Sequence, residues 1–225
     1  MKSDVKHVCS VAFGLVVLAM STSFAQVAPP PEVKTGDRLT YSYVGFQLGI
    51  KNIVELPAVQ EVASLAIEPA TEDRTYSSAN DSNVLRTNKQ FGPLLFRSTS
   101  VVLKNRPANV LRGKPVVGQA WEYEASYSRA NEVRDNCKVI DSKSKAAVSE
   151  GSDMTVQVKG IPTTLKTLLI THDSIWYNGA CGNGTAKTRF LYSPALNEFV
   201  SRESINYYLD RVNSGSSRTV LLSVD

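Results

Sequence analysis

One short stretch groups residue types that serve in hydrolytic catalysis. Thr171-His172-Asp173-Ser174 offers hydroxyl groups, a base and an acid within four positions. In a serine-type triad the acid orients the histidine, and the histidine takes the proton of the nucleophile. The residues around His172 predict a strand, and successive side chains of a strand point to opposite faces. His172 and Asp173 therefore cannot orient one another, and we expect a strand end that runs into a polar turn.

A pair of glutamates offers a second chemistry. Glu122 and Glu124 fall on one face of a predicted strand, and paired carboxylates can act as acid and base at a glycosidic bond. Neither lies in an apolar setting that would raise its pKa, so we interpret both as solvent-facing residues. The sequence has no Gly-x-Ser-x-Gly motif, and residues 182–187 match a phosphate-binding loop only loosely. We therefore predict no catalytic residues.

Two cysteines follow the N-terminal apolar segment. Cys137 and Cys181 are 44 residues apart, and an even number of cysteines in an exported chain favours a disulfide. A redox pair usually lies two residues apart. A metal site would need further ligands, and His172 has no second ligand at a recognisable spacing. We predict a structural disulfide, no metal site and no cofactor.

Charge is distributed unevenly along the chain. No acidic residue occurs between Ser82 and Trp121, but seven basic residues do: Arg86, Lys89, Arg97, Lys104, Arg106, Arg112 and Lys114. If they share one face, this basic segment would attract an anionic ligand. The alternative, favoured by their irregular spacing, is that they lie on different sides of strands and contact only water. No interleaving of aromatic and basic residues indicates a nucleic-acid groove, so we expect no nucleic-acid partner.

Aromatic residues mark one face of the clearest strand pattern. In residues 118–128 the side chains of Trp121, Tyr123, Ala125 and Tyr127 alternate with glutamates and serines. Residues 36–43 repeat this pattern with Tyr41 and Tyr43. The five aromatic residues could line a cup for an apolar or sugar ligand, or they could form a packed core. We favour the core, because aromatic residues on a single strand face are its usual material.

The elements that would position these residues are almost all strands. Residues 94–96, 99–103, 154–159, 163–171, 188–192, 199–209 and 219–224 also have strand character. In the last of them, alternation predicts Val220, Leu222 and Val224 on the inward face. Residues 57–67 favour a short helix that buries Val59, Val62, Ala63 and Ala66, with a strand over 61–67 nearly as good. We predict an all-β fold, mainly an antiparallel meander, that forms a barrel, half-barrel or sandwich with at most one short helix.

The N-terminus has the pattern of a secretory signal peptide. Lys2 and Lys6 precede the apolar run 8–20, and Ser23-Phe24-Ala25 offers small residues for cleavage. We predict a signal peptide over 1–25, a proline-rich lead-in over 26–35, a first β unit over 36–104, a linker over 105–114 and a second β unit over 115–225. We expect the mature protein to be periplasmic or secreted and not to span a membrane, because no later segment is sufficiently apolar.

The second half of the chain resembles uncharacterised periplasmic β-rich proteins of Gram-negative bacteria. Three segments carry the resemblance: the opening strand 118–123 with its Gly-x-x-Trp-x-Tyr pattern, the strand–turn–strand segment 156–165, and the Tyr-Ser-Pro-x-Leu-x-x-x-Val segment 192–200. The resemblance implies a β fold and a location in the cell envelope. It implies no activity and no site residues.

These observations favour a non-enzymatic exported protein that binds an envelope component. Candidate partners are an anionic lipid, a glycan or an envelope protein, bound through the mouth of a barrel or the basic segment. One alternative is a hydrolase that acts on cell-wall or lipid substrates, and another is a structural subunit of an envelope complex.

Overall fold

The computed structural model describes residues 30–48, 53–79, 83–97, 102–105, 109–129, 132–208 and 214–225. The predicted signal peptide and the first residues of the lead-in lie outside these ranges. Within them, two single-turn 3₁₀ helices are the only helical elements, η1 (Asp135–Cys137) and η2 (Gly179–Cys181). In the part of the chain that the structure describes, no helix is both long enough and apolar enough to cross a membrane. The remaining regular structure is strand, which confirms the predicted all-β class.

Fifteen strands are present in the part of the chain that the structure describes. They are β1 (Arg38–Leu48), β2 (Ile53–Glu55), β3 (Val59–Ile67), β4 (Arg74–Ser78), β5 (Val84–Thr87), β6 (Pro93–Arg97), β7 (Val102–Asn105), β8 (Ala120–Arg129), β9 (Val139–Glu150), β10 (Met154–Val158), β11 (Ile161–Leu165), β12 (Leu168–Tyr177), β13 (Asn183–Ser193), β14 (Glu198–Tyr208) and β15 (Ser214–Val224).

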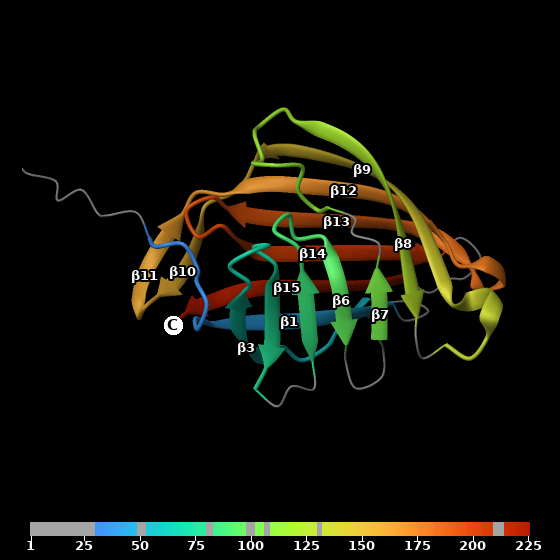
Figure 1. Cartoon of the computed structure of the whole chain (residues 1–225), viewed down its shortest axis with the longest axis horizontal. Helices are drawn as coiled ribbons and strands as arrows, with labels where there is room; N and C mark the ends of the chain where they lie inside the picture. The colour runs from blue at the N-terminus through green and yellow to red at the C-terminus, as the bar shows by residue number, and fades with distance from the viewer. Residues whose placement is uncertain are drawn as a thin grey trace, which may run out of the picture.

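One sheet contains all of these strands. Its hydrogen-bonded order is β11-β10-β15-β14-β13-β12-β9-β8-β7-β6-β5-β4-β3-β1-β2, and β1 also pairs with β15. The pairings are antiparallel except for the parallel contact between β10 and β15. In Figure 1 the long strands β9 and β12–β15 form one layer, and the shorter strands β3, β6 and β7 cross in front of it. The sheet thus curves so that strands from both predicted β units enclose a common interior.

The segment that favoured a helix is a strand. β3 pairs antiparallel with β1 on one side and with β4 on the other. These two ladders satisfy its backbone groups, and such tertiary pairing overrides a weak local helix propensity. Ala63 and Leu65 are buried, but Val59 and Ala66 are exposed. The side chains expected on the inward face of a helix are therefore divided between the two faces of the strand.

The predicted phase of the last strand is right at Val224 but wrong at Val220 and Leu222. Opposite β15 the register shifts between Thr40 and Tyr41, and Leu222 has no partner in the ladder with β1. A bulge of this kind inserts one extra residue and reverses the alternation beyond it. Leu221 and Val224 are consequently the buried residues of β15, in place of the expected Val220 and Leu222.

Two hydrophobic clusters pack the interior at one end. The first contains Leu39, Leu65 and Leu221, and the β10–β11 hairpin adds Val156 and Leu165 to it. The second surrounds Trp121 and Ile170. The predicted lead-in and the predicted linker also pack inward: the Val33 backbone N–H donates to the Leu196 carbonyl, the Leu111 backbone N–H donates to the Gln90 carbonyl, and both side chains are buried.

A buried ion pair joins the two layers beside these clusters. The Arg74 Nη1 donates to Glu198 Oε2 at 3.0 Å, and only 6% and 3% of the two side chains is exposed. The Tyr76 hydroxyl donates to the same carboxylate oxygen at 2.8 Å, and the Phe199 backbone N–H donates to the other at 2.8 Å. Burial raises the pKa of Glu198, and Arg74 opposes that rise.

We expect Arg74→Met to lower the free energy of unfolding by about 3–5 kcal/mol, because it leaves the Glu198 carboxylate buried without its counter-ion. The double variant Arg74→Met/Glu198→Gln removes that charge and should recover part of the loss. Urea unfolding at pH 7 measures both. Equal stabilities of the single variant and the wild type would show that the pair does not hold the layers together.

The predicted disulfide is present. Cys137 in η1 and Cys181 in η2 are bonded, with Cα atoms 5.5 Å apart. The bond holds together two turns that are 44 residues apart in the chain. It thereby ties the loop before β9 to the loop between β12 and β13.

The double variant Cys137→Ala/Cys181→Ala should lose about 2–4 kcal/mol of unfolding free energy, because its unfolded chain is no longer constrained by the loop. Urea unfolding with and without a reducing agent measures the effect. Reduction should destabilise the wild type by a similar amount and leave the double variant unchanged. A wild type that is insensitive to reduction would contradict this account.

Candidate functional site

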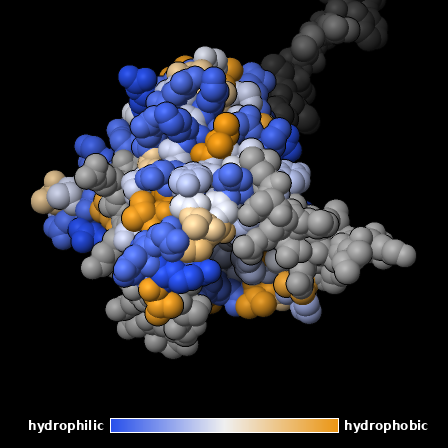
Figure 2. Space-filling model, turned by 90° about the vertical axis from the view of Figure 1, so that its right-hand side faces the viewer, coloured by the Kyte–Doolittle hydropathy of each residue, from blue (hydrophilic) through white to orange (hydrophobic). Residues whose placement is uncertain are grey.

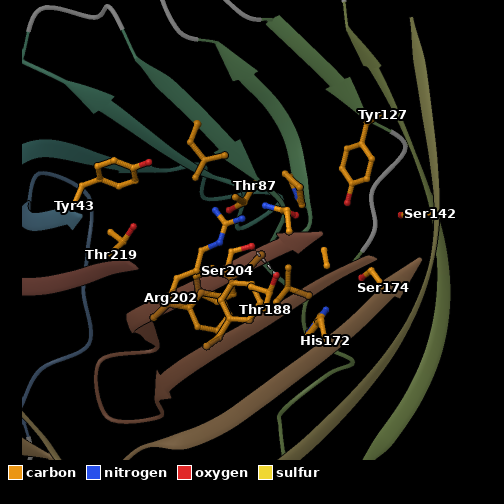
Figure 3. Close-up of a pocket in the computed structure, with 18 of the residues that line it drawn as sticks. Tyr43, Thr87, Tyr127, Ser142, His172, Ser174, Thr188, Arg202, Ser204 and Thr219 are labelled. Atoms are coloured by element: carbon orange, nitrogen blue, oxygen red, sulfur yellow. Dashed lines mark hydrogen bonds between the residues drawn. The ribbon is translucent and has the colours of Figure 1, made fainter. Parts of the chain in front are cut away.

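A cavity of about 1100 Å³ lies between the two layers. Residues of β1, β3–β5, β8, β9 and β12–β15 line it. In the close-up of Figure 3, side chains surround this space: Tyr43 and Tyr127 lie on opposite sides of the view, and Arg202 lies between and below them. The cavity lies beside the packed clusters, and Phe91, Phe190 and Phe199 line it where it meets them.

Small side chains explain why the interior remains open. Ser144, Ser174 and Ala186 occupy neighbouring register positions on β9, β12 and β13, and all three line the cavity. Ser144 and Ser174 hydrogen-bond through their hydroxyl oxygens at 2.7 Å. Inward positions of a wide sheet need large side chains to fill it, and these residues leave space that no neighbour occupies.

Four of the five predicted cup aromatics line the cavity. They are Tyr41, Tyr43, Tyr123 and Tyr127. Trp121 belongs instead to the packed core, where only 7% of its surface is exposed. The single aromatic face of β8 therefore serves both purposes that the sequence left open: its first residue packs in the core, and its tyrosines face the cavity.

His172 lies on the inward face of β12 and contacts no acidic side chain. Its Nδ1 shares a hydrogen bond with the Tyr123 hydroxyl at 2.6 Å, and its Nε2 has no hydrogen-bond partner among the described residues. Burial lowers the pKa of His172 to about 4, although the Val110 backbone opposes this shift. Burial also raises the pKa of Tyr123 to about 12. Both groups are therefore neutral at pH 7.

The neighbouring Asp173 points outward. Its side chain is 67% exposed and lies 3.9 Å from Lys187. The two faces of β12 thus separate the histidine from the acid, as strand alternation predicts.

Arg202 is the cavity residue that the sequence analysis missed. It lies on β14 between Phe190 of β13 and Thr219 of β15. In Figure 3 its side chain extends from β14 into the cavity. Its side chain keeps accessible surface and lines the cavity, and burial by the surrounding protein lowers its pKa.

The other charged residues that line the cavity have polar partners. Glu198 is paired with Arg74, and Arg134 is paired with Glu132. Glu61 accepts a hydrogen bond from the Asn83 side chain at 3.1 Å. Arg202 has no hydrogen bond or ion pair to any residue in the described ranges; its one close partner is the Phe190 ring, whose centre lies 5.8 Å from the Arg202 Cζ.

The sequence would have indicated Arg202 only if alternation along β14 had shown which of its residues face inward. The register places Arg202 opposite the buried Phe190 of β13, and Ser204, two positions further on, shares the face of Arg202. Both faces of residues 198–208 carry polar side chains, however, so the sequence pattern alone does not show which face is inward.

The predicted basic face is only partly described. Arg86 pairs with Asp73 at 2.9 Å, and Lys89 lies 3.7 Å from Glu72, so acidic residues from the β3–β4 connection accompany these two bases. The other five members lie elsewhere or outside the described side chains: Arg112 and Lys114 are exposed in the segment before β8, the side chains of Arg97 and Lys104 are not described, and Arg106 lies outside the described ranges. A shared anion-binding face therefore remains a prediction.

Glu122 and Glu124 lie on the outer face of β8. They form exposed ion pairs with Lys145 at 2.9 Å and Lys143 at 2.8 Å. Exposed pairs of this kind contribute little to stability, and the two carboxylates do not face the cavity. In the described ranges, no group of three or more histidine, cysteine or acidic residues could hold a metal ion.

Figure 2 shows one end of the molecule as a surface. Its hydrophobic residues form small separate groups among hydrophilic ones, and the coloured atoms show no extended hydrophobic patch on this face. Inside the molecule, by contrast, phenylalanine and tyrosine side chains gather around the cavity.

Comparisons with known proteins find similarity in fold only. No family model and no curated protein matches the sequence. Among solved structures, the hypothetical lipoprotein YmcC from Escherichia coli is similar with a TM-score of 0.46 and 10% identity, over 81% of this chain and 83% of that one. A candidate lipoprotein from Parabacteroides distasonis gives 0.39 and 11%, and a candidate exported protein with a YmcC-like fold from Bacteroides fragilis gives 0.43 and 10%; each covers 87% of this chain and 97% of its own.

The setting of His172 predicts a pH dependence of stability. The unfolded chain binds a proton at this residue near its ordinary pKa of 6.5, but the folded chain does so only at about 4. Between these values the unfolded state holds more protons, so stability falls as the pH is lowered. Relative to His172→Gln, the wild type should lose up to about 3 kcal/mol of unfolding free energy between pH 7 and pH 4.

Urea unfolding of both proteins at pH 4, 5, 6 and 7 measures this difference. Glutamine keeps a group that can bond to the Tyr123 hydroxyl but does not titrate, so other titrating residues cancel in the comparison. Parallel pH profiles of the two proteins would contradict the assignment of a neutral, buried histidine.

Proposed function

We propose that this protein is an exported, non-enzymatic β protein that binds an amphiphilic component of the cell envelope inside its cavity. The observation that carries the proposal is the cavity of about 1100 Å³, lined by tyrosine, phenylalanine and small hydroxyl side chains. Ligand cavities in proteins are typically of about 300–1000 Å³, so this space is large enough for a molecule of lipid size.

The chemistry of the lining supports an amphiphile. Phe190 and Phe199 present apolar rings where the cavity meets the core, and Ser142, Thr188 and Thr219 present hydroxyl groups elsewhere. Rings suit an apolar chain, and a few hydroxyl groups can orient a polar group. A tightly packed core would have excluded such hydroxyl groups or paired each of them.

The geometry does not favour the hydrolase alternative. His172 contacts Tyr123 and not a carboxylate, and its low pKa makes it a poor acceptor for a proton from a serine. No observation favours the alternative of a structural subunit.

Filling the cavity provides the test. Ala186 lines the cavity, and Lys187 beside it points to the outer face of β13 and is 69% exposed. We expect Ala186→Trp to weaken binding of the uncharged fluorescent probe N-phenyl-1-naphthylamine by at least about tenfold, because the indole occupies the site. Lys187→Trp adds the same side chain outside and should leave binding unchanged.

Probe fluorescence titrations measure the affinities, and thermal unfolding shows whether each variant is folded. Extraction of the protein purified from an exporting host, followed by mass spectrometry, should also recover a copurified amphiphile. A wild type that does not bind the probe, or an equal loss of binding in both variants, would overturn the proposal.

A further inference from the structure

Arg202 gives the cavity a charge that the described residues do not balance. Its neighbours across the sheet are Phe190 and Thr219, and Thr219 is in turn paired with Tyr43 of β1. Across the sheet, Phe190 is thus the neighbour of Arg202 on one side, and Thr219, followed by Tyr43, is its neighbour on the other. None of them carries a charge at pH 7.

No carboxylate near Arg202 takes the place of a counter-ion. Glu198 also lines the cavity, but it is already held by Arg74, Tyr76 and the Phe199 backbone. Glu61 is on β3, which is separated from β14 by β15 and β1. The groups that oppose the lowering of the Arg202 pKa are the phenols of Tyr127 and Tyr43, and no acidic residue is among them.

An unpaired guanidinium in an enclosed space is costly. A buried charge is normally paired or hydrogen-bonded, and arginine cannot escape the cost by losing its proton. Water can solvate the group while the cavity is empty. When an apolar chain displaces that water, an anion on the same ligand would restore the lost interactions.

Hydroxyl groups beside Arg202 extend the polar region. Ser204 follows on the same face of β14 and hydrogen-bonds with Thr188 at 3.2 Å between their oxygens. Figure 3 shows Thr188 and Ser204 beside Arg202, and Thr219 on the side of Arg202 that faces Tyr43. An anionic group at the guanidinium would therefore have further hydrogen-bond donors within the same part of the cavity.

We propose that Arg202 binds the acidic headgroup of an amphiphile, a carboxylate or a phosphate monoester, whose apolar chain lies along the phenylalanine-lined part of the cavity. This inference rests on the proposed function and specifies its ligand class. The planar guanidinium can donate two parallel hydrogen bonds to either anion. A fatty acid and a phosphorylated lipid precursor both present this chemistry.

Displacement of N-phenyl-1-naphthylamine by three ligands with the same chain tests the proposal. Dodecanoate and dodecyl phosphate carry the two anions, and dodecanol carries no charge. For the wild type we expect at least one anion to displace the probe at a concentration about tenfold lower than dodecanol does, because a charge-assisted hydrogen bond is gained. The anion that shows the larger advantage identifies the source of the headgroup.

Three variants make the result specific to Arg202. Arg202→Met should reduce the anions to the level of dodecanol, with the affinities for dodecanol and the probe unchanged. Arg202→Lys keeps the charge without the planar fork and should retain part of the advantage. Arg189→Met removes an exposed arginine from the outer face of β13 and should behave as the wild type.

Two results would overturn the role of Arg202: equal displacement by dodecanol and both anions in the wild type, or an anion advantage that persists in Arg202→Met. Either leaves the proposed function intact as long as the probe binds and Ala186→Trp blocks it. Failure of the wild type to bind the probe would overturn the proposed function itself.

Discussion

The ion pair between Arg74 and Glu198 is the constraint on which the interior depends. These residues are 124 positions apart, on β4 and β14, and they hold opposite layers of the sheet at a fixed separation. The arginine also stacks on Phe91, with its Cζ 4.6 Å from the ring centre. Because a buried charge tolerates neither loss nor displacement of its partner, the layers can neither slide nor collapse at this point. Aliphatic packing lies on one side of the pair, and Glu198 borders the cavity on the other.

Beyond the pair, side-chain volume decides the structure. Protein interiors are normally close-packed, and a sheet that encloses a wide interior can be filled only by large inward residues. Trp121, Phe190 and Tyr192 fill the second cluster. Ser144, Ser174 and Ala186 occupy equivalent inward positions further along the same layer and cannot fill it. The packed core therefore ends, and the cavity begins, where the inward residues become small. The disulfide between Cys137 and Cys181 constrains the chain where this packing is absent.

The strands, and the aromatic face of β8, could be predicted from alternation. A strand with one buried face alternates apolar and polar residues along the sequence. The disulfide followed from the number of cysteines and the expected export.

The strand β3 was not predictable with certainty, since its pairing with β1 and β4 outweighs a local preference that the sequence expresses equally well. The bulge in β15 reversed an alternation that looked regular. Arg202 was missed because polar residues on both faces of β14 conceal its phase, and only its register position opposite Phe190 shows which face is inward. The basic segment before β8 was evident in the sequence. In the fold, however, Arg86 and Lys89 pair with Asp73 and Glu72, which precede that segment in the chain.

The two interior arginines, Arg74 and Arg202, differ in the partners of their charges. Arg74 has a carboxylate, a stacked ring and almost no accessible surface, so its charge is fully used within the protein. Arg202 has a ring at 5.8 Å and an accessible surface, but no acid. A protein that needed Arg202 only for packing could hold an apolar side chain there at lower cost, since arginine cannot become neutral. Its charge is explained most simply if the missing partner arrives with the proposed ligand.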